Sequence, residues 1–306
     1  MAETPAAPAA AFPADSVRVP TASTQAEMFR TKHPECDGRG VIVAILDTGT
    51  DPGAPGLDTL TPDGRPKMID VVDATGSGDI GMATVRQATA PEDGGKPTVE
   101  GLSGRTITLN PEWTNPSGDW RVGAKPLFDV IPGALARRIK KERAKERDEA
   151  QRAATAAARS ALSEFEAANP AAKMSEADKA GHRELKQQLA QLEKAAKTVE
   201  DLGPTLDAVC WHDGDCWRGV VGTSDDGDVS GLEPLTNFKA ELKYGTFAGA
   251  NLDKQGTLMN YAVNIYDEGS ILSVVCDSGA HGTHVAGIVG AVHEDAPEFN
   301  GVAPGA

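Results

Sequence analysis

Residues 134–202 differ sharply in composition from the rest of this 306-residue chain. Residues 134–168 consist largely of Ala, Arg, Lys and Glu with almost no helix breakers, and a similar segment, 175–202, follows Asn169-Pro170. Long uninterrupted runs of good helix formers that flank a short breaker predict two helices joined by a tight connection. Any fold of this chain must therefore accommodate a long helical hairpin.

The second helix of the hairpin carries start and stop signals. Ser175 and Asp178 resemble a capping box in which Asp replaces Glu, and Gly203-Pro204 is a strong stop signal. The apolar residues of this segment recur at spacings of four, three, four and three, which forms one stripe along a helix: Leu185, Leu189, Leu192, Ala196 and Val199. We expect this stripe to pack against the first helix.

A run of six aliphatic residues, Val41 to Leu46, precedes the hairpin by almost ninety positions. Its continuous apolar character predicts a strand buried on both faces of a parallel sheet. The triplet Asp47-Thr48-Gly49 follows directly, so the Asp47 carboxylate is expected at the sheet edge where open α/β folds bind ligands. Alone, the triplet is a weak signal, since aspartic proteases and phosphate-transfer enzymes show similar ones, and Asp47 could simply cap a turn.

The sequence Ala280-His281-Gly282-Thr283-His284 opens a segment with small residues at positions 282, 286, 287 and 290. Small residues let a helix approach neighbouring backbone closely, so we expect this helix to pack against a sheet with His281 at its N-terminal end. A single histidine there is more often a packing residue. Aspartate followed by histidine, however, is the chain order of the subtilisin-type Ser-His-Asp triad. We therefore expect Asp47 to orient His281, and His281 to act as general base.

The full local context of both motifs resembles the subtilases, although 234 positions separate Asp47 from His281, against a few dozen in ordinary subtilases. With this insertion, the chain from about Phe29 to Ala306 resembles the N-terminal part of the tripeptidyl-peptidase II family. The motifs that carry this resemblance are Asp51-Pro52-Gly53-Ala54-Pro55-Gly56, Asp73–Asp79, Gly101–Arg105, Trp113–Gly118, Trp211-His212-Asp213-Gly214 and Asn264-Ile265-Tyr266-Asp267.

The resemblance implies a fold of the α/β class: a partial subtilisin-like parallel sheet with a large α+β insertion that contains the helical hairpin. The expected organisation divides the chain into four parts. These are a flexible tail (1–28), the first part of the subtilase domain (29–76), an insertion with the hairpin at about 134–202 (77–276), and the continued subtilase domain, truncated before the serine motif (277–306).

The resemblance also implies a cytoplasmic serine exopeptidase that releases tripeptides from free peptide N-termini and assembles into large homo-oligomers. No serine motif follows His281. Gly222-Thr223-Ser224 precedes it and is followed by acidic residues, so we expect a turn there. The nucleophilic serine and the oxyanion-hole asparagine are therefore expected outside residues 1–306. Loss of the serine alone removes almost all triad catalysis, so the chain by itself is expected to be inactive.

Composition excludes several other classes. With 45 acidic and 30 basic side chains, the net charge of −15 argues against a nucleic-acid partner. The longest aliphatic run is far shorter than the roughly 20 residues of a membrane span, and residues 1–15 lack the features of a secretory signal. Four cysteines are too few for a disulfide scaffold, which favours a reducing compartment. They are Cys36, Cys210, Cys216 and Cys276.

A two-residue turn at Asp213-Gly214 predicts that Trp211 faces Cys216 across a hairpin, which keeps Cys210 and Cys216 on opposite faces. Core packing is the favoured role for the four tryptophans, with a binding platform as the alternative. Likewise, Cys276 is expected to be a small buried hydrophobe, with an oxidant-sensitive thiol as the alternative.

No metal and no cofactor are expected. His281 and His284 lack the glutamate and the spacing of a zinc-protease motif. A turn explains the candidate cation ligands His212, Asp213, Asp215 and Cys216, and residues 225–228 do not fit the EF-hand pattern. Two functional alternatives stay open: a non-enzymatic assembly or adaptor module that uses the insertion, and a general subtilisin-like endopeptidase.

Overall fold

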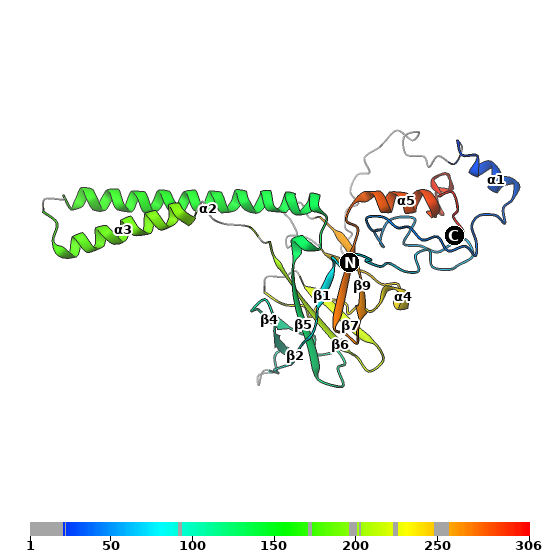
Figure 1. The fold of residues 1–306 in the computed structure, drawn as a ribbon, viewed down its shortest axis with the longest axis horizontal. Helices are drawn as coiled ribbons and strands as arrows, with labels where there is room; N and C mark the ends of the chain where they lie inside the picture. The colour runs from blue at the N-terminus through cyan, green and yellow to red at the C-terminus, as the bar shows by residue number, and fades with distance from the viewer. Residues whose placement is uncertain are drawn as a thin grey trace. The chain divides into compact units, whose positions relative to one another are not determined.

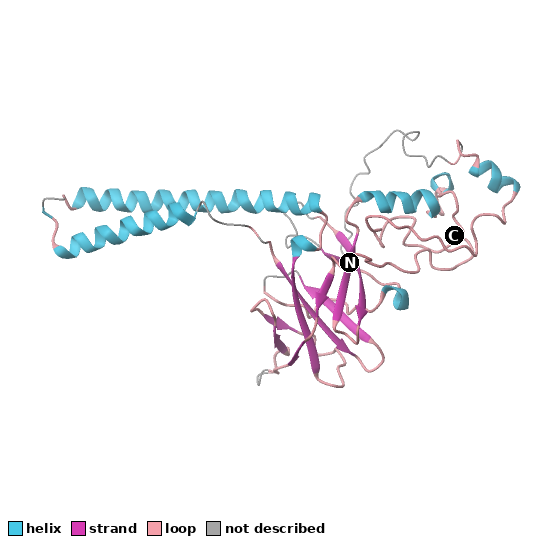
Figure 2. Cartoon of the chain, in the orientation of Figure 1, coloured by secondary structure: helices cyan, strands magenta, loops and turns pink. Residues whose placement is uncertain are grey.

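The computed structural model describes residues 21, 23–90, 94–170, 173–195, 201, 203–222, 226–247 and 257–306. It divides into two compact units, which we describe separately. Unit 1 comprises Met1–Pro132 and Thr205–Ala306, and unit 2 is Gly133–Pro204. Helices and sheets both contribute to the fold, as Figures 1 and 2 show. None of the helices in the described ranges is long and apolar enough to span a membrane.

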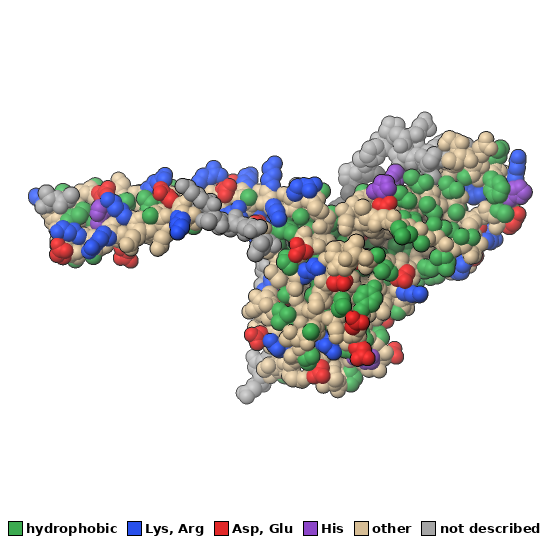
Figure 3. Space-filling view, in the orientation of Figure 1, with side chains coloured by type: hydrophobic (Ala, Val, Ile, Leu, Met, Phe, Trp, Pro, Cys, Tyr) green, Lys and Arg blue, Asp and Glu red, His purple; other side chains and the backbone are tan. Residues whose placement is uncertain are grey.

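Unit 2 is the predicted helical hairpin, formed by α2 (Gly133–Ala168) and α3 (Glu176–Ala195). The capping box at the start of α3 is confirmed: the Asp178 backbone N–H donates to Ser175 Oγ (3.1 Å), and the Ser175 N–H donates to the Asp178 carboxylate (2.9 Å). Charged side chains of both signs cover the hairpin surface in Figure 3, as expected for helices exposed to solvent.

The predicted apolar stripe of α3 faces α2 where the structure describes it. Leu185, Leu189 and Leu192 are half-buried, and Gln151 Nε2 of α2 donates to the Leu192 carbonyl oxygen (2.6 Å). Ala196 and Val199, the other two members of the stripe, lie outside the described residues.

Unit 1 contains two four-stranded antiparallel sheets (Figure 2). The first has the order β1-β10-β9-β8. Its strands are β1 (Asp79–Gly81), β10 (Ile271–Cys276), β9 (Met259–Tyr266) and β8 (Gly245–Phe247). Strands β9 and β10 follow one another in the chain and pair antiparallel as a hairpin.

The second sheet has the order β2-β5-β6-β7. Its strands are β2 (Thr84–Gln87), β5 (Asp119–Pro126), β6 (Thr205–His212) and β7 (Trp217–Gly222), and a separate pair is formed by β3 (Thr98–Glu100) and β4 (Thr106–Thr108). Trp113, Trp120 and Trp211 pack against one another in the core beside this sheet, with ring centroids 4.8–6.4 Å apart. Core packing therefore explains these three tryptophans.

The turn between β6 and β7 differs from the prediction. Trp211 pairs with Arg218 instead of Cys216, and His212 pairs with Trp217, so the loop has four residues. The Asp213 carboxylate causes the longer loop, because it accepts hydrogen bonds from the backbone N–H groups of Asp215 and Cys216 (both 2.8 Å). All four cysteines are unpaired thiols.

The remaining helices are short, apart from α5 (Ala280–Gly290), which carries the histidine motif. The others are α1 (Ala26–Lys32), α4 (Phe238–Glu241) and the 3-10 helices η2 (Leu127–Asp129) and η5 (Pro297–Phe299). The predicted tail, residues 1–28, falls mostly on residues 1–20, which lie outside the described residues. Helix α1 begins at Ala26, before the predicted end of the tail. The three boundaries between the four predicted parts stay predictions.

The run Val41 to Leu46 is not the buried strand that its composition predicts. It pairs with no strand in the described ranges, and Val41, Ile42, Val43 and Leu46 are 55%, 76%, 47% and 92% exposed. A parallel strand requires neighbours to bond its backbone and helices to cover its faces. The described strands pair antiparallel with one another, and none of them pairs with this run, of which only Ile45 is partly buried. Residues 68–72, another short apolar run, also form no strand.

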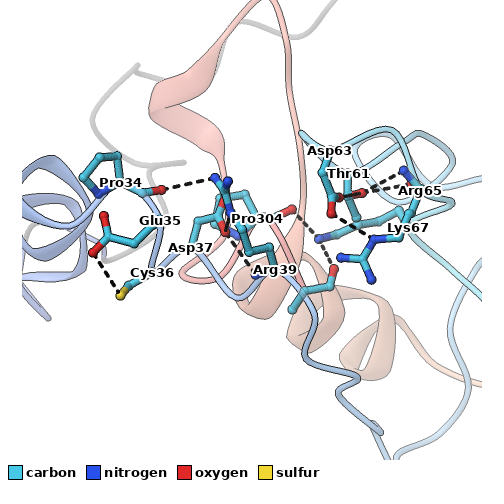
Figure 4. A network of polar contacts seen from close by, with 11 residues as sticks. Pro34, Glu35, Cys36, Asp37, Arg39, Thr61, Asp63, Arg65, Lys67 and Pro304 are labelled. Carbon is cyan, nitrogen blue, oxygen red and sulfur yellow. Dashed lines mark hydrogen bonds and ion pairs between the residues drawn. The ribbon is translucent and has the colours of Figure 1, made fainter.

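Polar contacts join the chain on both sides of the run 41–46 to the segment after α5 (Figure 4). Arg39 Nε donates to the Asp37 carboxylate (3.0 Å), and the Gly305 N–H donates to the Asp37 carbonyl oxygen (2.8 Å). Lys67 Nζ donates to the Pro304 carbonyl oxygen (2.7 Å). These contacts tie the loops at residues 37–39 and 67 to the segment that follows α5.

Candidate functional site

The structure brings together the two residues that sequence analysis selected as a catalytic pair. His281 Nδ1 lies 2.8 Å from Asp47 Oδ2 and 2.9 Å from Oδ1, across 234 positions of sequence. The side chain of Asp47 is only 16% exposed, whereas that of His281 is 74% exposed. A carboxylate on Nδ1 makes Nε2 the ring nitrogen that remains for proton exchange with a reacting group.

Backbone contacts hold the Asp47 carboxylate in place. The N–H of Thr48 donates to Asp47 Oδ1 (2.7 Å), and this bond, followed by that of the His281 side chain, holds the pKa of Asp47 below its usual value. The Thr48 carbonyl oxygen accepts from the Ser278 N–H (2.9 Å), while its hydroxyl donates to the Gly279 carbonyl oxygen (3.0 Å). Asp47 is therefore ionised and tied to the loop that leads into α5.

Glycine allows α5 to approach Asp47 closely. A Cβ on Gly282 would lie 2.0 Å from the Gly49 carbonyl oxygen and 3.2 Å from Asp47 Cβ. Gly49 itself has φ +109°, where other residues are strained, and a Cβ there would lie 2.5 Å from the Cys276 carbonyl oxygen. The small residues of both motifs thus permit the contact between Asp47 and His281, as their pattern predicts.

Sequence reasoning missed a second set of polar contacts beside the pair. The Thr283 hydroxyl donates to Asp277 Oδ2 (2.5 Å) and accepts from the Asp51 N–H (2.9 Å). The Asp51 carboxylate in turn accepts from Asn260 Nδ2 (2.9 Å). Thr283 and Asp51 lie in or beside the two motifs, but no periodicity or spacing predicts a contact between them. Asn260 lies on β9, outside both motifs.

The alternative reactive groups have different surroundings. Cys276 is buried, and burial raises the pKa of its thiol to about 12, so it stays protonated near neutral pH. In the Gly222-Thr223-Ser224 triplet, Thr223 and Ser224 lie outside the described residues. Asp213 binds Arg218 Nε (2.7 Å), and the described residues contain no cluster of three metal-ligating side chains.

Comparisons with known proteins give one consistent answer. A family model described as the subtilase family matches residues 38–306. The chain is 43% identical over 295 residues to Tripeptidyl-peptidase 2 of Arabidopsis thaliana, an alignment that covers 94% of this chain and 20% of that protein. Against Tripeptidyl-peptidase 2 of Caenorhabditis elegans it is 35% identical over 295 residues, which covers 96% of this chain and 20% of the relative.

Among solved structures, the chain resembles one titled "Crystal Structure of Tripeptidyl Peptidase 2 (TPP II)". The TM-score is 0.60 at 27% identity, over 91% of this chain and 20% of that chain. The predicted fold class, subtilisin-like α/β with a helical insertion, is confirmed by this likeness and by the family match. The chain spans about one fifth of the length of these relatives.

Proposed function

The chain belongs to the subtilase family, and from that premise we propose that it supplies two members of a Ser-His-Asp triad to a serine peptidase that releases tripeptides from free peptide N-termini. The observation that carries this proposal is the 2.8 Å contact between His281 Nδ1 and the Asp47 carboxylate. The tripeptidyl-peptidase names of the relatives at 43% and 35% identity support the exopeptidase specificity.

In the proposed mechanism, His281 Nε2 accepts the proton of the serine hydroxyl as that oxygen attacks the scissile carbonyl carbon. The imidazole then donates the proton to the departing amine, and the resulting acyl-enzyme is hydrolysed by water. Asp47 accepts the Nδ1–H bond throughout, which fixes the tautomer and stabilises the imidazolium. The lowered pKa of Asp47 keeps its charge available for this role.

We propose that the serine lies outside residues 1–306 and that these residues alone do not hydrolyse peptides. Two observations support this. The relatives are about five times as long as the chain. In addition, the run Val41 to Leu46 exposes apolar side chains and belongs to no strand pair among the described residues, as suits a segment that further strands of a parallel sheet would cover. Figure 3 shows hydrophobic side chains gathered on the part of unit 1 that carries α5.

The test uses the complete gene product that contains this chain. We expect it to cleave a tripeptide amide with a free amino terminus, and to cleave the acetylated peptide at least about a hundredfold more slowly. The Asp47→Asn variant should lose about 10⁴-fold in turnover because the His281 tautomer is no longer fixed. Equal rates on the two peptides would identify a general endopeptidase. No hydrolysis of either peptide would favour an adaptor module.

Two further expectations from the resemblance, a large homo-oligomer and a cytoplasmic location, stay proposals. The four unpaired thiols are compatible with a reducing compartment, where structural disulfides are rare. Sedimentation of the gene product measures the first, and fractionation of cells measures the second.

A further inference from the structure

Asn260 extends from the inserted sheet to the loop that follows Asp47. Its Nδ2 donates to Asp51 Oδ1 (2.9 Å), and its Oδ1 accepts from the Thr246 hydroxyl (2.7 Å), the residue opposite it in the β8–β9 register. Donor and acceptor ends of the amide are therefore both engaged, which fixes its orientation. The approach is close, because a Cβ on Gly53 would lie 2.4 Å from Asn260 Nδ2.

The hydrogen bonds continue from Asp51 to both sides of His281. The Asp51 N–H donates to the Thr283 hydroxyl (2.9 Å), which donates to Asp277 Oδ2 (2.5 Å). The other Asp277 oxygen accepts from the Gly279 N–H (2.8 Å) at the N-cap of α5. One connected path thus joins the insertion, the loop after Asp47 and the first turn of the helix that presents His281.

We propose that Asn260 is a positioning residue for the Asp47–His281 pair, supplied by the insertion. This inference rests on the proposed function. Asn260 contacts neither member of the pair. It bonds to Asp51, and the bond between Asp51 and Thr283 holds the loop after Asp47 against α5. A neutral amide suits this position, since a carboxylate would repel Asp51 and an aliphatic side chain would leave the Asp51 oxygen with one donor fewer, beside the Gly53 N–H (2.9 Å).

The same strand offers a matched control. Asn264 also lies on β9, but it is buried and its Nδ2 donates to the Val71 carbonyl oxygen (2.7 Å), away from Asp51 and Thr283. Loss of that bond should weaken the sheet without disturbing Asp51. Comparison of Asn260→Ala with Asn264→Ala therefore separates positioning from general destabilisation.

The first measurement follows the Nδ1-bound proton of His281 by NMR in the 306-residue chain, which needs no peptidase activity. In Asn260→Ala and Thr283→Val, we expect this proton to move upfield and to exchange faster with water. In Thr283→Ser, which keeps the hydroxyl, and in Asn264→Ala it should stay as in the unmodified chain, although Asn264→Ala lowers the melting temperature.

The second measurement uses the complete gene product. Asn260→Ala should lower kcat about tenfold or more with KM changed less than about twofold, because a misplaced base affects the chemical step more than binding. An unchanged proton signal and kcat in Asn260→Ala, or equal losses in Asn264→Ala, would overturn the proposal. If the unmodified gene product cleaves no peptide, the proposed function fails, while the NMR comparison still decides whether Asn260 positions the pair.

Discussion

Substitution of Gly282 by alanine tests whether close packing of α5 brings His281 to Asp47. The new Cβ would lie 2.0 Å from the Gly49 carbonyl oxygen, whereas such contacts normally begin near 3.3 Å, so the helix start and the loop must separate by roughly 1.3 Å. A misplacement of about 1 Å can lower a reaction rate about a hundredfold. Gly282→Ala is therefore expected to lower kcat/KM of the complete gene product by about two orders of magnitude.

Gly287 supplies the control on the same helix, because a Cβ there would meet no atom within 4 Å. Gly287→Ala should raise the free energy of unfolding by about 0.5–1 kcal/mol through helix propensity and leave kcat/KM unchanged. For Gly282→Ala, overpacking of about 1–3 kcal/mol outweighs that gain. Thermal melts and peptidase assays of both variants decide the matter: activity of Gly282→Ala within about threefold of the unmodified protein would refute this reasoning.

Two further predictions concern stability. Ser175→Ala removes the acceptor for the Asp178 N–H and should lower the stability of the hairpin by about 1 kcal/mol, measured by circular dichroism on heating; an unchanged transition would exclude a role for the cap. Burial lowers the pKa of Lys67 to about 8, although the negative charge of Asp37 acts to raise it. The unfolded chain therefore binds more protons between pH 8 and about 10.5, and the free energy of unfolding contributed by this group should rise across that window. Urea titrations across this pH range should show a smaller rise in the free energy of unfolding for Lys67→Met than for the unmodified protein. An equal rise would show that Lys67 is not the group responsible.

The features that sequence predicts well here depend on local patterns. The helical hairpin follows from composition and from the Ser175–Asp178 capping box, both of which act within a few residues. The Asp47–His281 contact was also predictable, because glycine and alanine at fixed positions limit how the helix can pack. The order of aspartate before histidine, which is that of the subtilisin-type triad, then related the two motifs, although no local pattern connects them.

The features that sequence misses depend on distant partners. Val41 to Leu46 has the composition of a central strand, yet composition cannot supply the neighbours that a ladder requires. The prediction of a two-residue Asp-Gly turn after β6 was wrong, because the Asp213 carboxylate favours a four-residue loop. Asn260 was missed because its contact with Asp51 spans 209 positions.

The hairpin lies within the connection between two paired strands of unit 1. Pro126 at the end of β5 pairs with Thr205 at the start of β6, and the hairpin, Gly133–Pro204, is contained in the connection between these two strands. In topological terms it is an insertion in the loop that joins two paired strands, so its length can change without altering the register of β5 with β6. Evolution could lengthen, shorten or delete such an arm in a single step, and an engineer could replace it with a tether or a reporter domain at the same junction.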